Sequence, residues 1–90
     1  MNMGAQKCVM EFPMDFPIKI MGESRDEFAQ TIVEIVLRHA PDYDVASTEM
    51  RPSRLGRYLS LTCTIRATSQ AQLDALYTEL SRHPLVKVVL

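Results

Sequence analysis

The sequence predicts an α+β fold in which two strand-helix-strand units share one antiparallel sheet. Segments with the alternation of strands and segments with helical spacing follow one another as strand, helix, strand, strand, helix, strand along the 90 residues. In addition, Ser24-Arg25-Asp26-Glu27 and Ser69-Gln70-Ala71-Gln72 both match the capping box, in which a serine and an acid or amide three residues later bind the first free amides of a helix. Each box follows an alternating segment and precedes a helical one, so the unit occurs twice.

The first unit begins with strict alternation over residues 16–21, which predicts a strand with one wet face. Ser24 is then expected to cap a helix over residues 25–40. Outside one polar stripe this helix is apolar, and the apolar arc is wider than covering one sheet face requires. We therefore expect Val33 or Leu37 to remain at the margin of the core.

The second unit carries the strongest strand pattern in the chain, over residues 58–68. The strand before it, residues 45–51, alternates weakly and is closed by Pro52, so we expect it at a sheet edge. A second helix is predicted over residues 70–82 and a last strand over residues 86–90.

Together these elements predict a ferredoxin-like βαββαβ sandwich with strand order 4-1-3-2 and both helices on one face. In that arrangement the turn at residues 22–24, the hairpin at residues 52–57 and the His83-Pro84 corner meet at one end of the sheet. The turn at residues 41–44 and Ser69 meet at the other end.

Size, charge and cysteine content exclude several classes of protein. Ninety residues make one small domain, which we expect over residues 13–90 after a flexible N-terminal tail at residues 1–12. The formal net charge of −1 gives no overall attraction to nucleic acid or anionic membrane, and no apolar run reaches the roughly 20 residues of a membrane span. Cys8 and Cys63 are not spaced as a metal or redox pair, so we expect a reduced, cytoplasmic setting and no cofactor.

A combination of short motifs extends over residues 11–90: Glu11-Phe12-Pro13, Phe16, Ile18-Lys19, Met21-Gly22, Arg38-His39-Ala40-Pro41, Pro52-Ser53, Gly56, Tyr58, Leu76-Tyr77, Leu80, Val86 and Val88-Val89-Leu90. The combination resembles the YbeD-like family of small bacterial cytoplasmic proteins of unknown function. The resemblance implies a ferredoxin-like fold akin to ACT-type regulatory domains, which bind amino acids at subunit interfaces. It also implies a genomic association with lipoate attachment enzymes, and it implies no catalytic residues.

The main candidate site is a basic cluster at the hairpin end of the expected fold. Its residues come from two loops that the topology brings together: Gly22, Glu23, Ser24, Arg51, Arg54 and Arg57. Free amides at a helix N-terminus and guanidinium groups suit a carboxylate or phosphate, and Gly22 would let the backbone approach that ligand. The same pattern fits a solvated loop, in which Gly22 serves a tight turn and Glu23 or Asp26 occupies the anion position.

Other residues with chemical potential fit structural roles. His39 and His83 each end a helix, at opposite ends of the expected fold, so we expect no metal site between them. Tyr58 faces outward on a central strand, as in RNA-recognition domains, but the surrounding face lacks their second aromatic and their basic character, which leaves nucleic acid a minor alternative. Cys63 is expected to be inward and inert. No Ser-His-Asp arrangement is plausible, and we expect no enzyme.

These observations favour a non-catalytic regulatory or ligand-sensing module that binds a small anion or amino acid. The alternative is a protein-interaction adaptor that uses a strand edge or the surface of the first helix, linked by family context to lipoate metabolism. Open edges at the second and fourth strands, with the wide apolar arc of the first helix, favour a homodimer. A monomer with short, twisted edges fits the same pattern.

Overall fold

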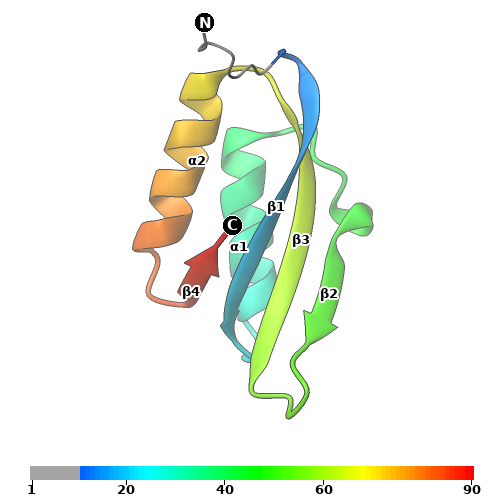
Figure 1. Ribbon diagram of the computed structural model, residues 1–90, viewed down its shortest axis with the longest axis vertical. Helices are drawn as coiled ribbons and strands as arrows, with labels where there is room; N and C mark the ends of the chain where they lie inside the picture. The colour runs from blue at the N-terminus through cyan, green and yellow to red at the C-terminus, as the bar shows by residue number, and fades with distance from the viewer. Residues whose placement is uncertain (1–10) are drawn as a thin grey trace, which may run out of the picture.

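The computed structural model describes residues 11–90, which form one sheet with two helices against one of its faces (Figure 1). Along the chain the elements are β1 (Met14–Glu23), α1 (Phe28–His39), the 3-10 turn η1 (Val45–Ser47), β2 (Glu49–Pro52), β3 (Tyr58–Ala67), α2 (Gln70–Arg82) and β4 (Val86–Val89). This order confirms the predicted succession of strands and helices, with η1 as an addition.

The sheet has the strand order β2-β3-β1-β4, and every neighbouring pair is antiparallel. The central pair, β1 and β3, runs from Met14 opposite Ala67 to Glu23 opposite Tyr58. The outer strands, β2 and β4, are four residues each. The predicted order 4-1-3-2 is therefore confirmed, with both edges formed by short strands.

Alternation along the central strands gives the sheet one buried face. On that face Ile18 and Ile20 of β1 pack with the inward residues of β3, while the residues between them are exposed. Each fully buried apolar side chain contributes roughly 1.5–3 kcal/mol. The helices supply most of the remaining core, from Phe28, Ile32, Ile35, Val36, Leu73, Leu76 and Leu80. Val33 and Leu37 are half-buried, which confirms that the apolar arc of α1 exceeds the core.

The expected start of the first helix is wrong. α1 begins at Phe28, and its cap residue Glu27 makes no capping hydrogen bond through its side chain. Ser24 instead donates its backbone N–H to the carbonyl of Arg57 (2.9 Å), which keeps this part of the chain tied to the end of the sheet. The chain turns only afterwards, when the Phe28 N–H bonds to the Arg25 carbonyl (3.1 Å). Ser24 directly follows β1 and lies three residues before the N-cap position Glu27, so it does not cap α1.

The second capping box is confirmed, and α2 has the predicted bounds. Ser69 Oγ accepts the backbone N–H of Gln72 (3.0 Å). In return, Gln72 Oε1 accepts the backbone N–H of Thr68 (2.7 Å), one residue earlier than in the usual box.

The predicted second strand begins too early, because its first residues form η1. The side chain of Asp44 accepts the N–H of Ala46 (3.1 Å), which stabilises a turn in place of extended chain. Tyr43, expected in a loop, is buried in the core, and its hydroxyl contacts Thr48 Oγ1. Because the buried Tyr43 and the Asp44 cap hold residues 45–47 in a turn, only Glu49–Pro52 forms a strand.

The expected tail at residues 1–12 falls mostly outside the described residues, as does Cys8. Phe12, at its end, packs partly against the core, and β1 begins at Met14, two residues before the predicted strand. Within residues 11–90, no helix has the length and apolar character needed to cross a membrane.

Candidate anion-binding site

The three loops predicted to share one end of the sheet do meet there (Figure 1). The hydrogen bond from Ser24 to Arg57 joins the turn after β1 to the β2–β3 hairpin. Gly22 lies opposite Val86, the first residue of β4, beside the corner that follows α2. At the other end, Gln72 Nε2 donates to the His39 carbonyl (2.8 Å), so that end also has the predicted neighbours.

Gly22 is required for packing at this end. A Cβ built on it would lie 2.3 Å from the carbonyl oxygen of Leu85 and 2.4 Å from Cε1 of Phe28. Both distances are shorter than any stable contact, and Gly22 itself is buried. Its lack of a side chain therefore lets β1 approach α1 and the start of β4, and its backbone is covered by protein.

Glu23 neutralises two of the cations nearby. Its Oε1 lies 3.3 Å from Nη2 of Arg25, and its Oε2 lies 3.9 Å from Nζ of Lys87. The Glu23 carboxylate thus lies between the turn and β4. Because it compensates the charges of Arg25 and Lys87, these two residues add little to the attraction of an anion.

The hairpin that carries the remaining arginines is well defined. Ser53 donates its backbone N–H to the Tyr58 carbonyl (2.8 Å), and its Oγ accepts the Tyr58 N–H (3.0 Å). Gly56 donates to the Ser53 carbonyl (2.9 Å) and has a φ of 74°, a conformation that glycine adopts readily. The sequence did not lead us to predict a role for Ser53 in this turn. A serine with a glycine three residues later is nevertheless typical of a turn.

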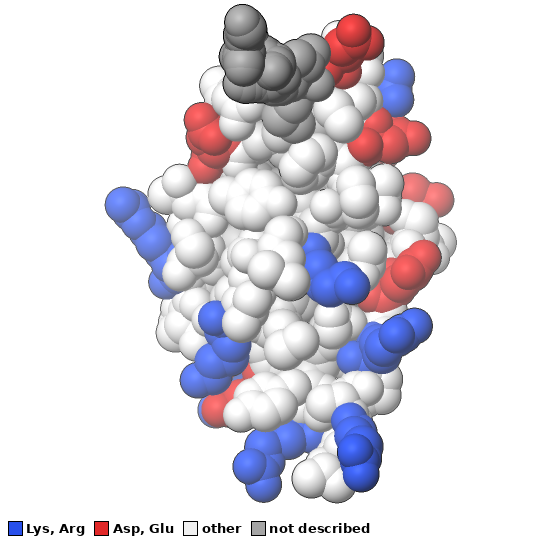
Figure 2. Space-filling view, in the orientation of Figure 1, with Lys and Arg blue, Asp and Glu red and all other residues white. Residues whose placement is uncertain are grey.

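Arg51, Arg54 and Arg57 are exposed at this end, and none has an acidic partner within 4.0 Å among residues 11–90. Figure 2 shows Lys and Arg side chains gathered at the hairpin end of the molecule. Three guanidinium groups on one ordered hairpin can bind a carboxylate or phosphate through charge-assisted hydrogen bonds. The amides that the sequence placed at Ser24 are not part of this group, because α1 starts later.

The other residues considered from the sequence are separated or occupied. His39 and His83 lie at opposite ends of the helical layer; His83 Nδ1 accepts the Leu85 N–H (3.1 Å). No group of three potential metal ligands is formed within residues 11–90. Tyr58 is exposed, and Cys63 is buried, where burial raises the pKa of its thiol. That higher pKa keeps the thiol protonated and unreactive.

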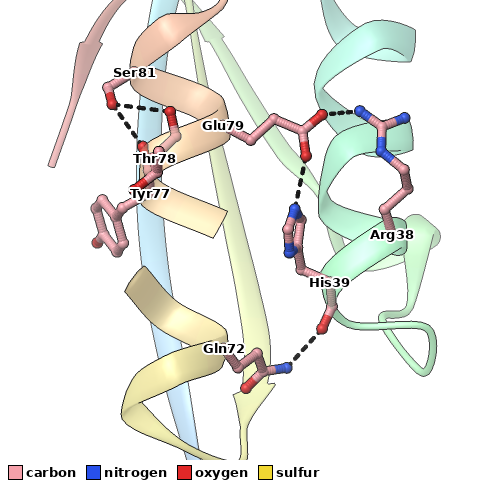
Figure 3. A network of polar contacts seen from close by, with 7 residues as sticks. All are labelled: Arg38, His39, Gln72, Tyr77, Thr78, Glu79 and Ser81. Carbon is pink, nitrogen blue, oxygen red and sulfur yellow. Dashed lines mark hydrogen bonds and ion pairs between the residues drawn. The ribbon is translucent and has the colours of Figure 1, made fainter. Parts of the chain in front are cut away.

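A polar cluster between the helices was not predicted (Figure 3). Glu79 of α2 bonds to the guanidinium of Arg38 and, at 2.7 Å, to Nε2 of His39, both at the end of α1. The hydrogen bonds from Arg38 and then His39 lower the pKa of Glu79. The sequence does carry a signal for this cluster. Arg38 and His39 are adjacent at the end of one helix, and Glu79 lies on the helix expected to pack antiparallel to it.

An apolar groove lies on the opposite side of α1, next to the open edge of β2. It has a volume of about 400 Å³ and is lined by Ala29, Gln30, Val33, Val45, Thr48 and Met50. Met50 is 60% exposed although it points to the helix side of the sheet. We call this the β2 groove.

The order β2-β3-β1-β4 with both helices on one face defines a ferredoxin-like fold. Protein HP0495 from H. pylori has the same fold, with a TM-score of 0.74 and 11% identity over 100% of this chain and 94% of that one. The ACT domain from GTP pyrophosphokinase of Chlorobium tepidum has a TM-score of 0.64 and 18% identity over 84% of each chain.

Residues 7–90 match the family described as Protein of unknown function (DUF493). A UPF0250 protein of Bordetella pertussis is 54% identical over 89 residues, which cover 99% of this chain and 98% of the relative. A UPF0250 protein of Ralstonia nicotianae is 53% identical over 85 residues, 94% of this chain and 88% of the relative. The chain therefore belongs to this bacterial family, and the resemblance expected from the short motifs is confirmed.

Proposed function

We propose that this chain is a non-catalytic ligand-sensing module of the bacterial cytoplasm that binds a small anion, such as an amino acid carboxylate or a phosphate, at the hairpin end. The observation that carries the proposal is the set of three exposed arginines, Arg51, Arg54 and Arg57, without acidic partners within 4.0 Å among residues 11–90. The Ser53 hydrogen bonds hold the hairpin that carries them, so little order has to be created on binding.

The fold supports the same role. The C. tepidum domain with a similar fold is by its title an ACT domain of GTP pyrophosphokinase. In this fold the loops meet at one end of the sheet, and the short strands β2 and β4 form its two edges. Binding of a ligand to those loops can therefore be coupled to the contact of another protein at an edge. The proposal involves no bond-making step: the guanidinium groups would bind and orient an anion.

An NMR titration with inorganic phosphate and with malonate tests the proposal. We expect saturable shifts of the amide signals of residues 22–26 and 52–58, and a roughly tenfold weaker affinity in Arg57→Ala, because a charge-assisted hydrogen bond is lost. Arg66→Ala is the matched control, since it removes the same charge from an exposed site near the other end of the sheet, where Arg66 contacts Asp15. Shifts that do not saturate and are equally produced by chloride would refute the site.

The β2 groove favours a second candidate, a protein-interaction adaptor. An open strand edge beside an apolar helix flank can receive an added strand from another protein. Affinity purification with the wild-type chain and with Met50→Lys as bait tests it. A bacterial protein retained by the first bait and lost with the second would support this role, and equal recovery with both would refute it.

A further inference from the structure

The free edge of β2 has a pattern that is complementary to itself. β2 is bonded only to β3, and all four of its residues are exposed. The Ser53 N–H bonds to the Tyr58 carbonyl, which fixes the alternation of the pair: Arg51 and Glu49 direct their backbone groups to β3, and Met50 directs its N–H and C=O away from it. The edge therefore presents one free donor and one free acceptor at Met50.

The side chains of β2 are divided between the two faces of the sheet. Met50 lies opposite Leu61, a core residue, so its side chain is on the helix face and borders the β2 groove. Glu49 and Arg51, opposite Thr62 and Ser60, lie on the outer face. An acid, an apolar residue and a base thus follow one another along the edge.

From this pattern we infer that a second copy of the chain docks on the β2 edge, antiparallel, with Met50 opposite Met50 on a twofold axis. Glu49 of each copy then lies opposite Arg51 of the other, which forms two cross-strand ion pairs on the outer face. The two Met50 backbones exchange a pair of hydrogen bonds. The β2 grooves of the two copies close against each other on the helix face, and an eight-stranded sheet results.

The charges select this register over its neighbours. A shift by two residues places Glu49 opposite Glu49 or Arg51 opposite Arg51, and like charges directly opposite each other are unfavourable. A shift by one residue places Met50, whose N–H and C=O are free, opposite Glu49 or Arg51, whose backbone groups point to β3, so no cross-strand hydrogen bonds form. Only the register centred on Met50 joins opposite charges and keeps the apolar grooves together.

The wider charge distribution agrees with the twofold arrangement. On the side of the molecule that carries β2, Figure 2 shows acidic side chains mainly above and basic ones below, toward the hairpin. A twofold axis through Met50 reverses the direction of the second copy. The basic half of each edge therefore meets the acidic half of the other.

Pro52 limits the strength of the contact. Pro52 is the next residue whose backbone groups point away from β3, but proline has no N–H to donate. On the other side of Met50, the Thr48 N–H already bonds to the Val45 carbonyl (3.1 Å). The ladder therefore has two hydrogen bonds, and the grooves and ion pairs supply the rest. We expect a dissociation constant on the order of 10 μM, typical of a small interface.

Sedimentation velocity of the full-length chain, from low micromolar to several hundred micromolar, tests the inference. We expect the wild type to convert from monomer to dimer over this range. Glu49→Arg alone and Arg51→Glu alone should weaken the dimer at least tenfold, because each places like charges opposite each other. An equimolar mixture of the two variants should recover a 1:1 heterodimer, since every position then meets the opposite charge.

The mixture distinguishes the interface from a folding defect, because misfolded variants would not restore each other. Lys19→Glu is the control for net charge: this residue is exposed on the outer face in β1, away from the edge. It should leave the dimer within about twofold of wild type. The inference does not depend on the anion site: Glu49→Arg leaves its three arginines in place. In the dimer Arg51 pairs with Glu49 of the other copy, and Arg54 and Arg57 remain for an anion.

A wild type that stays monomeric throughout, or a mixture with no heterodimer, would overturn the inference. So would a monomer that binds a different protein through Met50, since the edge would then belong to another partner.

Discussion

Gly22 lies against the ring of Phe28 and the carbonyl of Leu85, at the point where β1, α1 and the approach to β4 come together. From the sequence, a glycine after a strand predicted a turn or the approach of a ligand. The close contact depends on Leu85, which lies far away in the chain, and local patterns do not carry that information.

Gly22→Ala should therefore lower the free energy of unfolding by roughly 2–3 kcal/mol, because the added methyl group overpacks a site bounded partly by backbone. Gly56→Ala is a matched control, since nothing lies within 4 Å of its Cβ and only the φ of 74° opposes it. That cost is about 1 kcal/mol. Urea denaturation of both variants measures the difference, and equal costs would contradict the packing role of Gly22.

The two capping boxes show what element prediction can and cannot capture. Ser69 and Gln72 interact within one turn of the chain, so the sequence was sufficient to predict the bounds of α2. Ser24 has the same local pattern, but its N–H bonds to Arg57 on the hairpin, and this long-range contact delays α1. η1 has a similar cause, because the burial of Tyr43 and the Asp44 cap outweigh a weak strand pattern.

This difference has a measurable consequence for stability. Ser69→Ala should lower the free energy of unfolding by about 1 kcal/mol, since the Gln72 amide loses its acceptor. Ser24→Ala should change it by less than about 0.5 kcal/mol, because its bond to Arg57 uses only backbone. Thermal or urea unfolding of both variants checks this, and a larger cost at Ser24 would indicate that it caps α1 in solution.

Glu79 links the two helices and should make the stability depend on pH. The pKa of its carboxyl is lowered by the hydrogen bonds from Arg38 and then His39, so its contribution is complete above the unfolded-state pKa, near 4.5, and is lost as the pH falls through the lower folded-state value. The contribution stays below about 1 kcal/mol because the side chains are partly exposed.

Glu79→Gln should therefore reduce stability at pH 7 and converge with the wild type toward pH 3, as unfolding by urea across this pH range would show. Glu34→Gln is the control, because Glu34 contacts only the amide of Gln30 (3.3 Å) on the same helix. A difference between Glu79→Gln and wild type that is constant down to pH 3 would contradict the ion-pair assignment.

For the molecule as a whole, the sequence predicted the topology because strand alternation, helix periodicity and Pro or Gly boundaries agreed in each unit. It predicted the meeting of the three loops for the same reason. It did not predict which members of the proposed site are free, because Glu23 is paired with Arg25 and Lys87, and Gly22 is covered. Those outcomes depend on side-chain geometry at the corner of the sheet.

The reaction rate of the Cys63 thiol should measure how often the entire core unfolds. Cys63 is completely buried on the central strand β3, and burial raises the pKa of its thiol. In a Cys8→Ser background it should react with an aromatic disulfide reagent only through global unfolding, so the rate should rise with urea with the slope of equilibrium unfolding. Rapid reaction without urea, independent of its concentration, would show local access to the core.

The pairing of β1 also has a consequence for synthesis on the ribosome. β1 is made first among the described strands, yet both of its neighbours, β3 and β4, follow much later, and its first partner contact joins Met14 to Ala67. Until β3 has left the exit tunnel, both edges of β1 are therefore unpaired. Ile18 and Ile20, which are buried in the folded protein, are then exposed. Such long-range pairing slows folding, so the apolar face of β1 stays exposed to aggregation until β3 pairs with it.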